Sequence, residues 1–209
     1  MDKKKNVSMA VIKRLPKYHR YLEALKKNEV ERISSKDLGE KMGFTASQIR
    51  QDLNCFGDFG QQGYGYNVIG LYNQISEILG LSKQYNIVIV GAGNIGQALT
   101  NYTKFEDLGF SVQALFDINP KLIGLKIKNV EVKDIDTLGT YLSSNPVDIG
   151  IICVPAKYAQ SVSDIFIKNK IQGIWNFAPV DLVVPEQTKV ENAHLSDSLL
   201  TLTYLLNEK

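Results

Sequence analysis

The segment Gly91–Gly96, with the sequence GAGNIG, constrains the fold more than any other part of the chain. It follows a short apolar run, Asn86–Val90, that predicts a buried strand, and it begins a helical pattern, Asn94–Lys104. Glycines at this spacing permit a tight turn, close approach of the backbone to a pyrophosphate, and close packing of the helix on the strand. The predicted dinucleotide contacts are Gly91, Ala92, Gly93, Asn94, Ile95 and Gly96. The alternative is a glycine-rich turn that holds no ligand.

An acidic residue lies where such a unit places the adenosine ribose. Asp117 ends the apolar run Ser111–Phe116, 21 residues after Gly96. A carboxylate at this position can bind the ribose hydroxyls. Because a carboxylate repels a 2′-phosphate, Asp117 favours NAD over NADP, although Lys121 lies nearby.

The second half of the chain is expected to be α/β, with a parallel sheet covered by helices. From Tyr85 onward, apolar runs of four to six residues alternate with longer amphipathic segments, the pattern of βαβ units. Further strands are expected at Ser111–Phe116, Val130–Val132, Ile149–Val154 and Gly173–Asn176, and further helices at about 156–169 and 195–206. The last helix has a broad leucine face that must be covered, and a partner subunit could cover it.

The first 80 residues are expected to form helices joined by glycine-containing turns. Helices are predicted at 8–28, 36–42 and 46–56, with caps at Ser8, at Ser34 or Ser35, and at Thr45. Pro16 is expected to kink the first helix or shift its start, and Gly43 to end the second. The two short helices form a helix-turn-helix. Gly57, Gly60, Gly63 and Gly65 then favour a tight hairpin. The order predicts a winged helix, with domains at 1–80 and 81–209.

The third helix of this half has a polar face suited to DNA. Its side chains Ser47, Gln48, Arg50 and Gln51 include types that read base edges or bind phosphates in a major groove. Ile49 and Leu53, four residues apart, are expected in the core. Arg14 and Lys17 add phosphate-binding capacity on the first helix. The alternative is a small helical domain with an ordinary solvated face.

Charge supports the same division. Residues 1–80 hold 13 Lys and Arg against 9 Asp and Glu, and the remaining residues hold 11 against 13. Near-neutral charge and 44% apolar residues exclude a disordered chain, and the apolar runs are too short to span a membrane. No secretory leader is evident, so a cytoplasmic protein is expected. Two cysteines and two histidines, all far apart, predict neither a disulfide framework nor a metal site.

Together these residues closely resemble the Rex family of bacterial redox-sensing transcriptional repressors. The resemblance rests on Arg14–Pro16, Arg50–Leu53, the segment 56–66, the GAGNIG fingerprint, Phe116–Asp117, Val154–Pro155 and Asn176–Val180. It covers nearly the whole chain in the right order. It implies a homodimer with an N-terminal winged helix, a C-terminal Rossmann domain, and a last helix, about 194–207, exchanged between subunits. Such proteins bind palindromic operator DNA when NADH is scarce and release it when NADH rises.

The resemblance also assigns residues. Cofactor contacts carried over are Tyr102, Val154, Pro155, Phe177, Ala178 and Pro179. DNA contacts are Arg50 and its neighbours on the recognition helix, Thr45 at its start, and Gly63 and Tyr64 in the wing. Arg20 and His194 occupy the positions of a switch pair. A pocket lined by Tyr102, Ala178 and Pro179 would favour NADH, because burying the charged ring of NAD⁺ is costly.

Three departures from the family pattern affect this interpretation. Gln51 replaces a common Lys after the recognition-helix Arg, and Gln61 and Gln62 stand where a basic wing residue is common. His194 stands where the family often has an Asp that pairs with the Arg represented by Arg20. This part of the switch is therefore expected to differ.

The competing hypothesis is an enzyme, either an NAD-dependent dehydrogenase or a CoA-dependent enzyme, on the same Rossmann frame. Such an enzyme needs an acid or base beside the nicotinamide. The one reactive cluster after the fourth strand is Cys153, Lys157 and Tyr158, and about 129 residues leave little room for a substrate domain. Turnover of NADH with carbonyl substrates would distinguish the two hypotheses.

Overall fold

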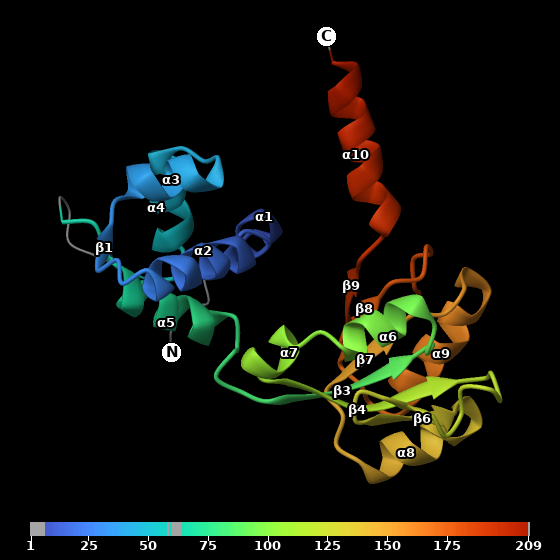
Figure 1. The fold of residues 1–209 in the computed structure, drawn as a ribbon. Helices are drawn as coiled ribbons and strands as arrows, with labels where there is room; N and C mark the ends of the chain where they lie inside the picture. Colours follow the sequence, from blue (N-terminus) through green and yellow to red (C-terminus); the bar gives the residue numbers. More distant parts are fainter. Residues whose placement is uncertain (1–6, 58, 60–63, 209) are drawn as a thin grey trace. The chain divides into compact units, whose positions relative to one another are not determined.

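The computed structural model describes residues 7–57, 59 and 64–208. The chain divides into two compact units, Met1–Lys83 and Gln84–Lys209 (Figure 1). The boundary expected near Gly80 lies three residues before this division.

The first unit is mainly helical. Its helices are α1 (Met9–Ile12), α2 (Leu15–Lys27), α3 (Ser35–Met42), α4 (Ala46–Asn54) and α5 (Val68–Ile78). Two short antiparallel strands, β1 (Arg32–Ile33) and β2 (Tyr66–Asn67), pair with Ile33 opposite Tyr66. The single first helix expected over 8–28 is wrong, because α1 ends at Ile12 and α2 begins at Leu15. Pro16 lies in the first turn of α2, where its missing N–H costs no helical hydrogen bond.

Helices α3 and α4 form the expected helix-turn-helix. Ser34 caps α3 by accepting a hydrogen bond from Asp37 N, and Thr45 caps α4 by accepting one from Gln48 N. Gly43 ends α3 with φ +74°. Ile49 and Leu53 of α4 are buried in the core as expected. The expected extension of α4 to residue 56 is wrong, since the helix ends at Asn54.

The glycine-rich hairpin lies mostly outside the described residues. Gly60, Gln61, Gln62 and Gly63 belong to that part of the chain. The chain is described again from Tyr64, whose side chain is 71% exposed, and leads into β2.

The second unit is built on a seven-stranded sheet in the order β5-β6-β4-β3-β7-β8-β9. The strands are β3 (Tyr85–Val90), β4 (Phe110–Asp117), β5 (Lys126–Ile127), β6 (Val130–Asp134), β7 (Ile149–Ile152), β8 (Gly173–Asn176) and β9 (Lys189–Asn192). All neighbours pair in parallel except β5 and β6. The Rossmann-like parallel sheet expected from the sequence is confirmed.

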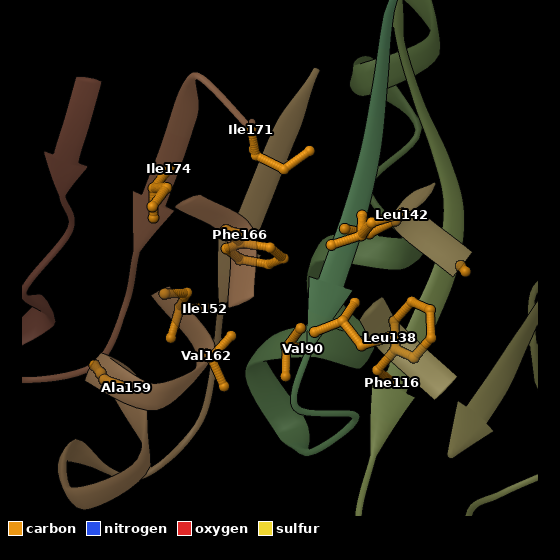
Figure 2. Packing of buried hydrophobic residues seen from close by; sticks show 13 residues of the cluster. Val90, Phe116, Leu138, Leu142, Ile152, Ala159, Val162, Phe166, Ile171 and Ile174 are labelled. Atoms are coloured by element: carbon orange, nitrogen blue, oxygen red, sulfur yellow. The ribbon is translucent and has the colours of Figure 1, made fainter. Parts of the chain in front are cut away.

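Helices cover both faces of this sheet. They are α6 (Asn94–Thr100), α7 (Lys104–Asp107), α8 (Leu138–Ser144) and α9 (Ala156–Lys168), with a 3-10 turn at Ile135–Thr137. On one face, strand residues Val90, Phe116 and Ile152 pack against α8 and α9 (Figure 2). Phe166 of α9 lies so close to Gly150 that a Cβ there would be 2.3 Å from its ring. The glycine in β7 therefore sets how closely α9 approaches the sheet.

Two expected elements end earlier than predicted. The helix expected over 94–104 ends at Thr100, and α7 is a separate turn. Thr100 Oγ1 donates to Gly96 O and Asn101 Nδ2 donates to Gln97 O, which suits a helix end because such side chains compete for backbone hydrogen bonds. The strand expected to reach Val154 ends at Ile152, so the next three residues form a loop.

The chain ends in α10 (Leu195–Asn207), which extends away from the sheet beyond β9 (Figure 1). Its leucine face is exposed in the single chain: Leu195 by 66%, Leu199 by 62%, Leu202 by 49% and Leu206 by 75%.

Candidate functional site

Two positions in the turn after β3, Gly91 and Gly96, can be occupied only by glycine. Gly91 has φ +102°, and a Cβ there would lie 2.4 Å from Cys153 O. A Cβ on Gly96 would lie 2.0 Å from Gly91 O, so α6 packs directly on the turn. The turn is tied to the neighbouring strand by Gly91 N, which donates to Phe116 O at 2.7 Å.

Gly93 differs from these two glycines because space beside it is open. Within the described residues, nothing lies within 4 Å of where its Cβ would be. The start of α6 at Gly93 receives no side-chain cap, and the first N–H groups of a helix have no partner within the helix. An open backbone with unpaired N–H donors fits a pyrophosphate. These residues would hold the diphosphate of a dinucleotide.

Asp117 lies at the carboxyl end of β4, beside this turn. Its Oδ2 accepts from Ala92 N at 2.7 Å and its Oδ1 accepts from Asn119 N at 2.8 Å. Each carboxylate oxygen keeps a second lone pair that a ribose hydroxyl could use. The carboxylate is therefore fixed in place by the fingerprint turn itself and fits the ribose of the same ligand.

The other predicted cofactor residues come from two adjacent strands and one loop. Val154 and Pro155 follow β7, and Phe177–Pro179 follow β8, at the same carboxyl edge as the turn after β3. Ala178 is 1% exposed, whereas Pro179 is exposed. Tyr102 lies in the loop between α6 and α7 and is 49% exposed.

A row of aromatic rings leads from that loop to β8. The ring centroids of Tyr102 and Phe105 are 5.1 Å apart, those of Phe105 and Trp175 are 6.2 Å apart, and those of Trp175 and Phe177 are 4.6 Å apart. The structure therefore links Tyr102 to the loop after β8 through two rings. The sequence patterns single out neither Trp175 nor Phe105 as cofactor residues. The sequence signal for Phe105 is faint, because it is one aromatic residue in a short helix.

The candidate reactive cluster is not an activated nucleophile. Burial raises the pKa of the Cys153 thiol to about 12, so the thiol stays protonated at neutral pH. Lys157 Nζ lies 4.6 Å from the ring centroid of Tyr158. No group of three or more His, Cys, Asp or Glu residues suited to a metal is found among the described residues.

The exposed face of α4 is the candidate DNA-contacting surface. Ser47, Arg50 and Gln51 are exposed on it, as is Thr45 just before it. Arg50 Nη1 donates to Ser35 Oγ of α3 at 3.0 Å. Ser35 was expected only as a possible helix cap, and the structure adds this contact with Arg50.

Behind this face lies a buried polar cluster centred on Asp52, which is 1% exposed. Its carboxylate accepts from Arg14 Nε at 2.6 Å, Arg14 Nη2 at 2.7 Å, Tyr18 Oη at 3.0 Å and Gln48 Nε2 at 2.7 Å. Burial alone would raise the Asp52 pKa, but the hydrogen bonds from Arg14, Gln48 and Tyr18 outweigh it and lower that pKa. Sequence reasoning missed the role of Asp52, whose only signal is an acid four residues after Gln48.

Three predicted DNA contacts therefore have bonds within the unit. Gln48 and Arg14 bind Asp52, while Lys17 Nζ donates to Met42 O and lies 4.7 Å from the ring centroid of Phe44. Arg14 and Lys17 hold α2 against the helix-turn-helix. Tyr64 is exposed, and its carbonyl accepts from Arg32 Nη1 at 3.3 Å. Gly63 lies outside the described residues.

The two candidate switch residues lie in different units. Arg20 is exposed on α2. His194 precedes α10, with Nδ1 3.6 Å from Asp197 Oδ2, and its buried Nε2 has no hydrogen-bond partner among the described residues. Pairing between Arg20 and His194 stays a prediction.

No helix in the part of the chain that the structure describes is long and apolar enough to cross a membrane.

Comparison with known proteins agrees with both halves of this picture. Residues 6–54 match the family described as "Putative DNA-binding protein N-terminus", and residues 82–180 match that described as "CoA binding domain". The chain is 72% identical over 208 residues to the redox-sensing transcriptional repressor Rex of Clostridium botulinum strain Hall, covering 100% of this chain and 99% of that protein. It is 69% identical over 209 residues, with the same coverage, to Rex of Clostridium tetani.

Solved structures give the same result. RSP in complex with β-NAD⁺ and operator DNA matches with a TM-score of 0.92 at 60% identity, covering 98% of this chain and 94% of that chain. RSP in complex with β-NADH matches with a TM-score of 0.90 at 57% identity, covering 98% and 96%. A further structure of RSP is described as a Rex-family repressor. With relatives this similar over their whole length, and with a helix-turn-helix unit followed by a Rossmann-like unit, the chain belongs to the Rex family of redox-sensing transcriptional repressors.

Proposed function

We propose that this protein is a transcriptional repressor that binds palindromic operator DNA as a homodimer and releases it when NADH binds. The observation that carries the proposal is the combination, in one chain, of a helix-turn-helix and a dinucleotide turn, in a sequence 72% identical throughout to a protein named for redox sensing. One RSP structure contains β-NAD⁺ with operator DNA, and another contains β-NADH. These similar proteins support DNA and a dinucleotide as the two ligands of this chain.

The DNA-binding half would use the exposed face of α4. Arg50 can pair bidentately with guanine, and Ser47 and Gln51 flank it one turn or one residue away. Ser35 holds the Arg50 guanidinium in place before DNA arrives, which lowers the ordering cost of binding. Phosphate contacts by the basic first half would add salt-dependent affinity.

The sensing half would hold the dinucleotide at the turn after β3. Gly93 leaves room for the diphosphate and Asp117 would hold the adenosine ribose. The bound dinucleotide supplies the signal, because its nicotinamide ring is positively charged when oxidised and neutral when reduced. The loop Phe177–Pro179 is apolar, so a neutral ring would be accommodated at lower cost than a charged one.

The two halves would be connected through a dimer. The exposed leucine face of α10 needs a cover, and exchange of this helix between two copies would supply one. NADH can release DNA only if it prefers one of two dimer arrangements. In the arrangement that NADH stabilises, the two recognition helices would no longer match successive major grooves.

The enzyme hypothesis has less support. A thiol with a pKa of about 12 is a poor nucleophile, and the neighbouring Lys157 lies on the ring of Tyr158. The distinguishing measurement is NADH oxidation with common carbonyl substrates. Efficient turnover would favour an enzyme.

The proposed function is tested by an electrophoretic mobility shift on a palindromic operator, titrated with NADH and with NAD⁺ at one fixed salt concentration. We expect NADH to release the DNA and NAD⁺ to do so weakly. Unchanged operator affinity at saturating NADH would refute the proposal.

A further inference from the structure

Asn176, the last residue of β8, is a fully buried polar residue that joins two functional segments. Its Oδ1 accepts from Ala178 N at 3.0 Å. Its Nδ2 donates to Val180 O at 2.8 Å and to Asn192 Oδ1 at 2.9 Å, with a longer contact of 3.3 Å to Ala178 O. One side chain therefore fixes the loop after β8 and also reaches the end of β9.

These bonds use the amide fully on its donor side. An asparagine amide has two hydrogens, and the two short bonds to Val180 and Asn192 account for both. Asn176 thus has no donor left for a ligand and acts by positioning the loop Phe177–Val180. Its backbone carbonyl also accepts from Ala193 N at 2.8 Å.

Asn192 extends the connection. It lies opposite Asn176 in the β8–β9 register, and its Nδ2 donates to Asp181 Oδ1 at 3.2 Å. Two residues further along the chain is His194, the residue before α10. The side chains of Asn176, Asn192 and Asp181, here called the amide network, therefore join both ends of the segment Phe177–Val180 to the end of β9, which leads into α10.

The network is more than strand pairing requires. The β8–β9 ladder already aligns the two strands from Gly173 to Asn176. An apolar side chain could fill a buried position at a strand end, whereas a buried amide needs every partner satisfied. Such a linkage is sensitive to movement, because a shift of the loop would leave the buried amide of Asn176 without a partner unless the end of β9 moved too.

We propose that the amide network couples the cofactor-facing loop after β8 to α10, so that occupation of the nicotinamide end of the site changes the orientation of α10. This inference rests on the proposed function and assigns Asn192 and Asp181 as positioning residues of the switch. Both lie outside the dinucleotide turn, so their removal would weaken communication more than binding.

The test measures the coupling factor, the ratio of operator Kd values with and without saturating NADH, at one salt concentration. In Asn192→Asp, the new carboxylate can still accept from Asn176 Nδ2. It has no N–H to donate to Asp181, so two carboxylates face each other. We expect the coupling factor to fall by about tenfold, within the range found for residues that carry coupling. The NADH Kd from calorimetry and the operator Kd without NADH should change by less than about twofold, well under 1 kcal/mol on the usual conversion.

The double variant Asn192→Asp with Asp181→Asn restores a donor facing an acceptor and should recover most of the coupling. Asn145→Asp makes the same chemical change on an exposed amide at the end of α8, which binds only Tyr141 O in its described contacts, and should leave the coupling factor unchanged. Because coupling is reciprocal, the NADH Kd measured with and without operator must give the same factor.

The outcomes separate the two proposals. If the unaltered protein shows no NADH effect on operator binding, the proposed function fails. If it responds and Asn192→Asp responds equally, or if the double variant recovers nothing, the amide network is not the coupling element. A large loss of NADH affinity in Asn192→Asp would also overturn the inference, because the network would then only support the pocket. If Asn192→Asp does not fold, the coupling factor is measured instead in Asp181→Ala, a change at an exposed position. An unchanged coupling factor in Asp181→Ala would contradict the proposal.

Discussion

Arg14 and Asp52, 38 residues apart in the chain, form a two-pronged ion pair that fastens α2 to the recognition helix. Nε and Nη2 of the arginine each donate to a different carboxylate oxygen, at 2.6 and 2.7 Å. The same carboxylate receives Gln48 of the recognition helix. The angle at which α4 presents its exposed face therefore depends on a side chain that faces the core.

The first prediction concerns the stability of the DNA-binding unit. Asp52→Asn keeps the shape but removes the charge that holds Arg14, so we expect a loss of about 1.5–3 kcal/mol in unfolding free energy, the range for hydrogen bonds to charged groups. Urea unfolding at neutral pH measures it. Asp37→Asn, at an exposed position on α3, is the control and should cost much less. Equal losses in both variants would contradict the role given to Asp52.

The second prediction follows from the lowered pKa of Asp52. A carboxyl group whose pKa is lower in the folded than in the unfolded state, where it is about 3.9, stabilises the fold above that value. This contribution is lost as the pH falls through the folded-state pKa. The stability difference between the unaltered protein and Asp52→Asn should therefore shrink as the pH falls below about 4. Urea unfolding at a series of pH values checks this, and a constant difference would argue against it.

The third prediction concerns Arg50. Arg50→Ala should weaken specific operator binding by about 1–3 kcal/mol or more, as expected for loss of a bidentate base contact, and leave the NADH Kd unchanged. Lys168→Ala, which removes one positive charge at the end of α9, should bind the operator normally. Mobility shifts at fixed salt give both affinities. Normal operator binding by Arg50→Ala would mean that α4 does not read the DNA.

The fourth prediction concerns the ribose carboxylate. Asp117→Ala removes an acceptor for the ribose and the anchor of Ala92 N, so we expect NADH binding to weaken by about 1.5–3 kcal/mol. Asp148, at the opposite end of the sheet, accepts from Asn86 N in a similar way. Asp148→Ala is thus a matched control, and calorimetry should find its NADH Kd unchanged. If both variants lose NADH affinity equally, the loss reflects reduced stability of the unit and not a contact between Asp117 and the ribose.

The fifth prediction concerns the leucine face of α10. Leu202→Glu should convert the proposed dimer to a monomer, because burying each leucine contributes about 1.5–3 kcal/mol and a buried charge opposes assembly. With 100° of rotation per residue, Thr201 lies well away from the face formed by the leucines. The variant Thr201→Glu should therefore remain dimeric. Sedimentation velocity distinguishes the two. A dimeric Leu202→Glu would place the interface elsewhere.

Features set by neighbouring residues could be predicted from the sequence. Ser34 and Thr45 cap their helices through backbone atoms three residues away, and Gly91 to Gly96 act within one turn. Strands β5 and β9 and helix α8 were not predicted, because they are short and their patterns are weak without their neighbours.

Contacts between distant residues were beyond the sequence patterns. Asp52 is held by Arg14, and Asn176 by Asn192, pairs that only the folded chain brings together. Pro16 signalled a break near the start of α2, although its position at the first turn of a second helix depended on where α1 ended. The aromatic row through Phe105 likewise depends on how α7 lies on the sheet.

That row also has an optical consequence. Trp175 is the single tryptophan of the chain, and its ring lies 4.6 Å from that of Phe177, in the loop expected beside the nicotinamide. Indole emission overlaps the absorption of reduced nicotinamide but not that of the oxidised ring, so excitation energy can pass only to the reduced form. The fluorescence of Trp175 should therefore report NADH binding directly in unlabelled protein, without a signal from NAD⁺.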